Sequence, residues 1–340
     1  MKYLFELNHP KHYYQFKYVM QILKSQGHDI VVLARDKDVL LNVLEEEGVP
    51  YIVFGKHRKS MWAKILGTFG LMLNYWTITR RERPDVIVSK ASWYGTAMAK
   101  VLHKKSVIFP DSEVVKVTNR YVVPICSRVV TPQPFQLNYG AKHRRIAGIF
   151  EDCYLSPTVL NPDSSVVEKY SLSTPYAILR FVGWQANHDV GNGGFNYKQK
   201  KALVEAIARY MTVYISSEKP LPEELSAYKL PTPANAIHDV LFCADLYVGD
   251  SQTMAAEAAL LGTPAIRSNT FVGPNDMSNF IMLEKEYGML YNIANPDEAI
   301  EKARQLAEHS CKEEWLLKRQ QYYSHVGDTN AAIVDLLTNL

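Results

Sequence analysis

The first half of the chain alternates short apolar runs with longer amphipathic stretches. The amphipathic stretches 14–25 and 39–47 predict helices, and a glycine suited to a helix C-terminus follows each of them, Gly27 and Gly48. The apolar runs predict strands at residues 3–7, 30–34, 51–54, 86–89, 106–109 and 128–131. Because strands that alternate with helices form parallel sheets, we expect a doubly wound α/β domain here.

The same alternation starts again after the polar segment 156–163. Helices are predicted over 198–210 and within 234–244. The strands predicted in this second series are 176–181, 212–216, 246–248 and 265–267. We therefore expect two Rossmann-like domains with a cleft between them, where the ligands of α/β proteins usually bind.

The run 249–266, GDSQTMAAEAALLGTPAI, predicts a helix that begins at a strand end. Asp250 and Ser251 are good N-caps, and small residues follow until Gly262 ends the helix. The amides and the dipole at such an N-terminus favour phosphate, and Glu257 lies less than two turns further on, within reach of two ribose hydroxyls. The run therefore predicts a nucleoside diphosphate site. The alternative interpretation is an ordinary capped helix.

This run resembles the donor-binding segment of proteins with the GT-B fold, in particular the UDP-N-acetylglucosamine 2-epimerases. Those proteins carry Asp-Ser-Gly-Gly, three more residues, Glu-Ala, a short gap and Gly-x-Pro. The matching positions are Asp250, Ser251, Glu257, Ala258, Gly262 and Pro264. Gln252 and Thr253 stand where the two glycines would be. The resemblance implies a nucleotide-binding role for Asp250, Ser251, Thr253 and Glu257.

Over nearly its whole length the chain more closely resembles domain-of-unknown-function family 354, which is grouped with GT-B glycosyltransferases. The segments that carry the resemblance are LNHP at 7–10, LRF at 179–181, HDVG at 188–191, ISSE at 215–218 and FVG at 271–273. The resemblance implies a GT-B-like α/β fold with two Rossmann-like domains facing across a cleft. The expected parts are an acceptor domain at 1–155, a nucleotide-sugar domain at 165–315, and a C-terminal helix over 316–340 that crosses back.

Two histidines follow the first predicted strand, in the segment Asn8-His9-Pro10-Lys11-His12. A nicotinamide enzyme would carry G-x-G-x-x-G at this strand end, and its absence argues against an oxidoreductase. His9 is a candidate general base for an acceptor hydroxyl, because the pKa of histidine lies near neutrality. The alternative is a histidine that caps the following helix or is satisfied in the core. Asp111 and Glu113, which follow the strand at 106–109, are further acid/base candidates.

The acid set of the epimerases is incomplete in this chain. In the epimerases the stretch that corresponds to 111–113 contains a catalytic Glu, and Glu-x-x-Asn-Arg follows downstream. Asn119 and Arg120 are present here, but Val115 and Lys116 occupy the approach where the second acid is expected. The segment 90–92 reads Lys-Ala-Ser, whereas the corresponding segment of the epimerases is similar to His-Gly-Asp. Both absences favour glycosyl transfer over epimerisation.

Positive charge is expected around the donor diphosphate in the second domain. Arg180 ends a predicted strand and His188 follows it, where the epimerases place His-x-Arg-Glu-Asn. These side chains would neutralise a leaving UDP, which lets GT-B enzymes work without a metal. Ser216 and Ser217 end the next strand and are expected to line the base pocket. We therefore expect no metal and no cofactor, and we interpret the D-x-D triplet 36–38 as a helix cap.

Charge is divided unevenly along the chain. Residues 1–150 carry 23 Lys+Arg and 11 Asp+Glu, a net +12, whereas residues 151–340 carry 15 and 24, a net −9. Basic clusters flank the apolar segment 62–79, in which Lys64 and Asn74 argue against a membrane span. We interpret this segment as a buried helix, and a helix that also rests on a membrane surface is the alternative. Nothing beyond charge suggests nucleic-acid binding.

Together these features predict a metal-independent GT-B glycosyltransferase that uses a UDP-sugar and a lipid-linked or saccharide acceptor. The resemblance implies a role in cell-envelope or surface-polysaccharide assembly. Four scattered cysteines and the lack of a signal peptide predict a cytoplasmic protein, with peripheral contact at the inner face of the membrane. One alternative is an isomerase like the UDP-N-acetylglucosamine 2-epimerases. The other is a non-catalytic nucleotide-sugar sensor or scaffold.

Overall fold

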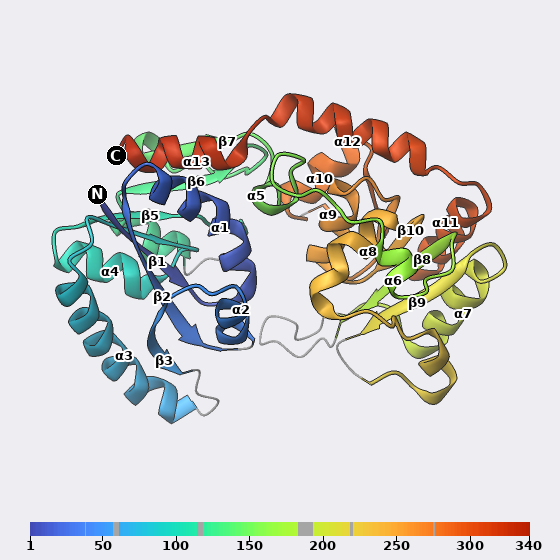
Figure 1. Cartoon of the computed structure of the whole chain (residues 1–340), viewed down its shortest axis with the longest axis horizontal. Helices are drawn as coiled ribbons and strands as arrows, with labels where there is room; N and C mark the ends of the chain where they lie inside the picture. Colours follow the sequence, from blue (N-terminus) through green and yellow to red (C-terminus); the bar gives the residue numbers. More distant parts are fainter. Residues whose placement is uncertain (38, 57–60, 114–117, 183–192, 218–219, 275) are drawn as a thin grey trace. The chain divides into compact units, whose positions relative to one another are not determined.

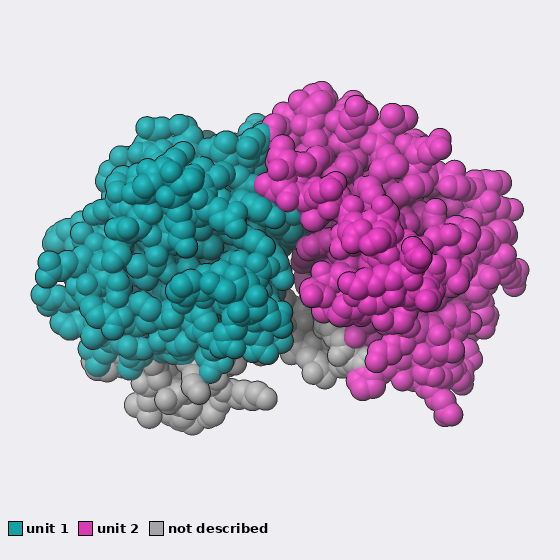
Figure 2. Space-filling model, in the orientation of Figure 1, with its two compact units in different colours: residues 1–154, 328–340 teal, residues 155–327 magenta. Residues whose placement is uncertain are grey.

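The chain divides into two compact units, shown in Figures 1 and 2. Unit 1 comprises residues 1–154 and 328–340, and unit 2 comprises residues 155–327. The computed structural model describes residues 1–37, 39–56, 61–113, 118–182, 193–217, 220–274 and 276–340. Each unit is a parallel sheet with helices on both faces, as the sequence predicts.

Unit 1 contains a seven-stranded sheet in the order β3-β2-β1-β4-β5-β6-β7, in which every neighbouring pair is parallel. The strands are β1 (Lys2–Leu7), β2 (Asp29–Asp36), β3 (Ile52–Lys56), β4 (Val86–Ser89), β5 (Lys105–Ile108), β6 (Arg128–Pro132) and β7 (His143–Ile146). The hydrophobic pattern predicts the first six. It does not predict β7, because two exposed arginines, Arg144 and Arg145, occupy its middle positions.

Helices cover both faces of the sheet in unit 1. On one face α1 lies beside the C-terminal helix α13, where Phe16 and Ile333 share a core (Figure 1). On the other face α3 and α4 bury Tyr75 and Met98. The helices are α1 (Pro10–Ser25), α2 (Leu40–Glu46), α3 (Met61–Glu82), α4 (Trp93–Val101), α5 (Asp152–Leu155) and α13 (Thr329–Thr338), with short turns η1 (Thr118–Val122), η2 (Val123–Ile125) and η3 (Gly140–Lys142).

Unit 2 contains a five-stranded parallel sheet in the order β12-β11-β10-β8-β9. The strands are β8 (Tyr176–Phe181), β9 (Thr212–Ser217), β10 (Leu246–Gly249), β11 (Ala265–Arg267) and β12 (Leu290–Asn292). The helices are α6 (Val166–Lys169), α7 (Tyr197–Ile207), α8 (Ile237–Cys243), α9 (Gln252–Leu260), α10 (Ser278–Lys285), α11 (Pro296–Glu308) and α12 (Lys312–Val326), with short turns η4 (Glu223–Tyr228) and η5 (Ala234–Ala236). The sequence predicts the first four strands and misses the three-residue β12.

The helical region at the C-terminus is divided at Gly327. This glycine has a φ of 69° and ends α12, and the Asp328 side chain then caps α13 by accepting from the Ala331 amide at 3.0 Å. In unit 2, the indole of Trp315 on α12 donates to the Met289 carbonyl at 2.8 Å. In unit 1, Asn330 on α13 donates to the Cys153 carbonyl at 2.9 Å. The two helices therefore belong to different units.

The apolar segment 62–79 lies within α3. Tyr75 and Ile78 are buried against the sheet, whereas Leu73 and Trp76 are 51% and 37% exposed. Within the part of the chain that the structure describes, no helix is both long enough and apolar enough to cross a membrane. α3 is therefore a helix of unit 1 with one face against the sheet.

Candidate functional site

The carboxyl ends of β1, β4 and β5 lie next to one another in unit 1, because these strands are parallel neighbours. Lys90 follows β4 and Asp111 lies just beyond β5. α1 begins at the same edge, so Lys11 and His12 in its first turn join them. The edge therefore brings Asp111, a predicted site residue, together with three residues that the sequence did not single out as site residues.

Lys90 and Asp111 form an ion pair with 3.1 Å between Nζ and Oδ2. The lysine side chain is 5% exposed and the aspartate side chain 44%. The Lys90 ammonium also lies 4.1 Å from the centre of the Phe150 ring. Burial lowers the pKa of Lys90, and Asp111 only partly offsets this. Burial alone would raise the pKa of Asp111, but the charges of Lys90 and Lys11 outweigh it and hold that pKa below its usual value, so Asp111 is ionised.

A second ion pair joins Lys11 to Glu151, with 2.8 Å between Nζ and Oε1. Lys11 and Glu151 both act on the charge of Lys90, so the two pairs belong to one charge-balanced cluster. His12 lies in the same cluster. Burial, followed by the charge of Lys90, lowers the pKa of His12 to about 3. His12 is therefore a neutral side chain beside ionised ones.

The two histidines at this edge both use Nδ1 as an acceptor. His9 is the N-cap of α1, and its Nδ1 accepts from the Lys11 amide at 3.1 Å. The Nδ1 of His12 accepts from the Asn8 amide at 3.2 Å. A neutral imidazole that accepts at Nδ1 carries its proton on Nε2, so Nδ1 of each ring is engaged in a contact with the local backbone. This geometry favours the capping alternative for His9 over the role of general base.

Glu113 lies in the loop after β5 and holds that loop to its surroundings. Its Oε1 accepts from the Gln136 amide at 3.4 Å, and its backbone carbonyl accepts from the Asn119 side chain at 3.5 Å. Asn119 in turn accepts from the Tyr139 hydroxyl at 2.6 Å. Asn119, which matches the epimerase motif, therefore stabilises the loop. Of the three predicted catalytic residues, Asp111 has the best-defined environment.

Glu6 on β1 is a buried carboxyl that the sequence did not suggest as a site residue. Its oxygens accept from Tyr75 at 3.0 Å and from the Asn8 side chain at 2.9 Å. Burial raises the pKa of Glu6, and hydrogen bonds from Ser92, Asn8 and Tyr75 offset only part of the rise. Ser92 corresponds to the Asp position of the His-Gly-Asp segment named above, and it also caps α4. Glu6 therefore connects β1 to α3 and to the start of α4.

In unit 2 the predicted donor residues lie at the carboxyl edge of the sheet. Arg180 on β8 donates from Nη1 to the Ser216 hydroxyl on β9 at 2.9 Å, and Ser217 ends β9. Ser251 caps α9 by accepting from the Met254 amide at 3.4 Å, and Thr253 lies in the first helical turn. The amides of this first turn have no partners within the helix and point toward the same edge.

Asp250 is 1% exposed and connects the ends of the loop between β8 and α7. Its Oδ1 accepts from the Val182 amide at 2.8 Å. Gly194 lies so close that a Cβ at this position would overlap the Asp250 side chain. The Asn269 side chain donates to the Asp250 carbonyl at 2.9 Å. Asp250 therefore positions the strand end, and this geometry favours a supporting role over direct contact with a ligand.

Glu257 lies in the second turn of α9 and faces His238 of α8, with 3.6 Å between Oε1 and Nε2. The two side chains are 11% and 22% exposed. Burial lowers the pKa of His238, but the hydrogen bond and charge of Glu257, together with the charge of Asp239, more than offset this and raise it above 6.5. The sequence did not predict the pair, because His238 gives the pattern of an ordinary helical residue.

Comparisons with known proteins place this geometry in a known architecture. Residues 2–153 match the sequence model of a family described as "Protein of unknown function (DUF354)". No sequence among the curated proteins matches the chain. The UDP-GlcNAc 2-epimerase of Neisseria meningitidis bound to UDP-GlcNAc is 12% identical, with a TM-score of 0.71 and 100% of each chain covered. Acinetobacter baumannii MurG is 15% identical, with a TM-score of 0.63 and the same coverage.

A third similar structure is the spinosyn rhamnosyltransferase SpnG complexed with thymidine diphosphate, at 12% identity and a TM-score of 0.61, with 99% of this chain and 100% of that chain covered. The fold is GT-B. The predicted fold class is confirmed, and the predicted resemblance to family 354 is confirmed over residues 2–153. At identities this low, the structural similarity shows the fold alone. The chemistry of the chain has to be argued from its own residues.

The predicted site residues of this GT-B chain fall into three groups. Asp111, Arg180, Ser216, Ser217, Ser251, Thr253 and Glu257 lie at or near the carboxyl edge of their own sheet. His9, Glu113 and Asp250 make the local contacts described above. His188, and Asp38 of the D-x-D triplet, lie outside the described residues. Strand order, which the sequence does not show, is what brings Lys90 to Asp111 and Arg180 to Ser216.

Proposed function

We propose that this chain is a GT-B glycosyltransferase that transfers a sugar from a nucleoside diphosphate, with UDP-sugars as the first candidates. The observation that carries the proposal is the carboxyl edge of unit 2. There Ser251 caps α9, Glu257 lies in the next turn, and Arg180 lies on a neighbouring strand. A helix N-terminus, a cation and a carboxylate in this order fit a diphosphate and its ribose.

In this proposal unit 2 binds the donor. The first amides of α9 and the guanidinium of Arg180 bind the diphosphate, and Glu257 accepts hydrogen bonds from the ribose hydroxyls. Ser216 and Ser217 lie beside the nucleotide, and His188 adds charge to the diphosphate. These positive groups stabilise the leaving nucleoside diphosphate, so the proposal requires no metal and no cofactor.

Unit 1 binds the acceptor, and Asp111 is its candidate catalytic group. Lys90 keeps Asp111 ionised, and nearly half of the Asp111 side chain is exposed. An ionised, accessible carboxylate orients an acceptor hydroxyl and accepts its proton as the new bond to the anomeric carbon forms. The bond from the anomeric carbon to the phosphate oxygen breaks in the same reaction, and the nucleoside diphosphate leaves.

An epimerase is the second candidate, because a UDP-GlcNAc 2-epimerase is among the similar structures. Epimerisation requires groups that exchange protons near neutral pH. The serine at position 92, which caps α4 where the epimerases carry a segment like His-Gly-Asp, supplies no such group. A non-catalytic sensor would use the unit 2 site alone, without turnover.

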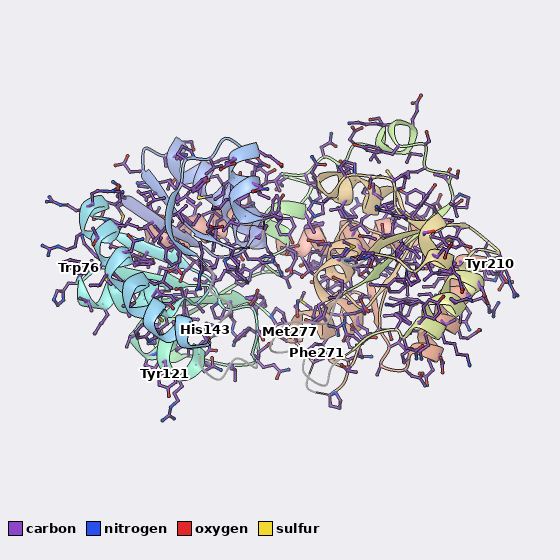
Figure 3. All side chains as sticks on the ribbon, turned by 90° about the horizontal axis from the view of Figure 1, so that it is seen from below. Trp76, Tyr121, His143, Tyr210, Phe271 and Met277 are labelled. Carbon is purple, nitrogen blue, oxygen red and sulfur yellow. The ribbon has the colours of Figure 1, made fainter. Side chains whose placement is uncertain are left out.

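We also propose that the acceptor is lipid-linked or a saccharide of the cell envelope, and that unit 1 contacts the cytoplasmic face of the membrane. On α3, Leu73 and Trp76 are exposed, and the Arg80 guanidinium lies 4.9 Å from the centre of the Trp76 ring. Figure 3 shows Trp76 at the outside of unit 1. An apolar strip beside arginines fits an anionic lipid surface.

The proposal is tested by binding followed by turnover. Thermal unfolding is measured with UDP, UDP-N-acetylglucosamine, thymidine diphosphate and NAD. A ligand at 100 times its dissociation constant should stabilise the protein by about 2.7 kcal/mol. Glu257→Gln should abolish the shift, whereas Glu205→Gln, at an exposed position on α7, should leave it unchanged. No shift with any sugar nucleotide would contradict the proposal.

Turnover separates the three candidates. Conversion of UDP-N-acetylglucosamine at C2 without an acceptor identifies an epimerase. Release of the nucleoside diphosphate that depends on an added acceptor identifies a transferase. Binding that requires Glu257 but gives neither product with any acceptor identifies a sensor.

A further inference from the structure

The Glu257 carboxylate lies in surroundings that disfavour an uncompensated charge. Its neighbours on α9, Ala255, Ala256, Ala258 and Ala259, are all fully buried, and Glu257 itself is 8% exposed. Burial raises the pKa of the Tyr247 phenol on β10, and the charges of Asp250 and Glu257 add to the rise. A carboxylate in such a place requires a cation or hydrogen-bond donors to stay ionised and to keep one orientation.

His238 supplies a cation at this position. α8 leads into β10 and α9 leaves it, so the start of α8 and the first turns of α9 lie at the same edge of the sheet. His238 is the second residue of α8, and its Nε2 lies 3.6 Å from Glu257 Oε1. Among the residues that the structure describes, the charged groups that act on His238 include Glu257 from α9 and Asp239 from its own helix. Both favour the imidazolium.

We propose that His238 is a positioning residue for nucleoside binding: its imidazolium holds the Glu257 carboxylate in the orientation that receives the ribose hydroxyls, and nucleotide binding therefore weakens as the imidazolium is lost. This inference rests on the proposed function, because it takes the ligand of Glu257 to be a ribose. It adds a residue and a pH dependence that the donor site as described above does not contain.

The direction of the pH dependence follows from the pair. Below the raised pKa of His238 the ring is charged and the pair is intact. As the pH rises through that pKa, the ring becomes neutral and Glu257 loses the positive charge of His238, so affinity falls. By linkage, a bound nucleotide that depends on the pair raises the pKa of His238 further. One pKa unit of such coupling corresponds to about tenfold in affinity across the transition.

The test measures binding of UDP-N-acetylglucosamine to the full chain by calorimetry between about pH 5.5 and pH 8. Its diphosphate has no ionisation in this range, so a slope reports on the protein. The wild-type chain should bind about five- to tenfold more weakly at the upper end. His238→Gln should bind weakly at both ends and show a smaller slope than the wild-type chain, since His188 of the proposed donor site is still present. His309→Gln, at an exposed position in the same unit, should keep the wild-type slope.

A second measurement follows the His238 ring by NMR without ligand. Its pKa should fall in Glu257→Gln, because the paired charge is removed. A pKa unchanged by Glu257→Gln, or a wild-type slope that survives in His238→Gln, would overturn the inference while the donor site stands. If the wild-type chain binds no nucleotide at any pH, the proposed function fails, and the inference fails with it even where NMR finds the pair.

Discussion

Lys90 and Asp111 form an ion pair of 3.1 Å in which the lysine is the buried partner and the aspartate the exposed one. The two residues follow neighbouring strands, β4 and β5, so the pair joins the segments that leave these strands. Its asymmetry has a physical consequence. A carboxylate that is 44% exposed remains hydrated without its partner, whereas a buried ammonium does not.

The first prediction concerns this asymmetry. Asp111→Asn leaves the Lys90 ammonium buried without its counterion, and it should destabilise the protein by about 1–3 kcal/mol. Lys90→Met removes the buried charge, keeps an apolar side chain against Phe150, and should change stability by less than about 1 kcal/mol. Urea denaturation of both variants measures the difference. A greater loss in Lys90→Met than in Asp111→Asn would contradict the pairing described here.

Lys90→Met has a second expected effect, on the charge of Asp111. Without the Lys90 ammonium, the pKa of Asp111 should rise from its lowered value. Burial raises this pKa, and of the two lysines that lower it only Lys11 remains. Carbon-detected NMR of the carboxyl group measures the change. If the reaction uses an ionised Asp111, the acid limb of its rate profile should move to higher pH in this variant. An unmoved limb would exclude Asp111 as the base.

Acid stability of unit 1 should depend on His12. Burial and Lys90 lower the pKa of His12 to about 3, whereas the unfolded chain has a value of about 6.5. The neutral folded form is therefore stabilised above pH 6.5, and this contribution is lost as the pH falls from about 6.5 toward 3. Each pKa unit of difference is worth about 1.4 kcal/mol.

His12→Asn keeps an acceptor for the Asn8 amide and removes the titration. Its free energy of unfolding, measured from pH 7 to about pH 4, should fall less steeply than that of the wild-type chain. His103→Gln, at an exposed position of unit 1, should keep the wild-type slope. Equal slopes in the wild-type chain and His12→Asn would show that this ring is accessible to protons in the folded protein.

The alternation of apolar runs with amphipathic helical stretches was sufficient to predict the two parallel sheets, because buried parallel strands are apolar along their whole length. It was not sufficient for β7, where Arg144 and Arg145 face outward at the sheet edge. A strand with polar middle residues resembles a loop until its neighbour is known. The capped helix after β10 was predicted correctly, because its start and stop signals lie within a few residues of one another.

The candidate site could be predicted only where its chemistry is local in sequence. Ser251 and Glu257 share one helix, so their spacing already places them together. The partners of Asp111 and Glu257 come from other elements: Lys90 reaches Asp111 through strand order, and His238 reaches Glu257 through the contact between α8 and α9. No spacing rule connects such pairs, which explains why Lys90 and His238 were missed.

The loop between β8 and α7 should depend on the glycine at position 194. A Cβ there would overlap the buried Asp250 side chain, whereas a Cβ at Gly193 would meet nothing within 4 Å. Gly194→Ala should therefore cost about 1–3 kcal/mol and displace Asp250 from the Val182 amide. Gly193→Ala is the matched control and should be tolerated. Thermal unfolding compares them, and similar losses in both variants would contradict the close approach.

The same two variants report on the proposed donor site. If Asp250 positions the strand end beside α9, Gly194→Ala should weaken UDP-sugar binding by more than its effect on global stability at the assay temperature explains. Calorimetric titration below the unfolding transition measures this. Full affinity in a folded Gly194→Ala protein would separate Asp250 from the nucleotide site altogether.

The last prediction concerns the exposed strip of α3. An arginine at an anionic lipid surface contributes about 1 kcal/mol, so Arg80→Ala with Arg81→Ala should weaken binding to phosphatidylglycerol vesicles by at least about tenfold. Trp76→Ala should weaken it further, because the indole is 37% exposed and is suited to the membrane interface. Leu317→Ala removes a side chain that is 66% exposed on α12 of unit 2, and it should have no effect. Co-sedimentation with anionic and with neutral vesicles distinguishes the charge contribution from the apolar one. Equal sedimentation of all four proteins, or binding that is the same on neutral vesicles, would remove α3 as the membrane contact and favour a soluble saccharide acceptor.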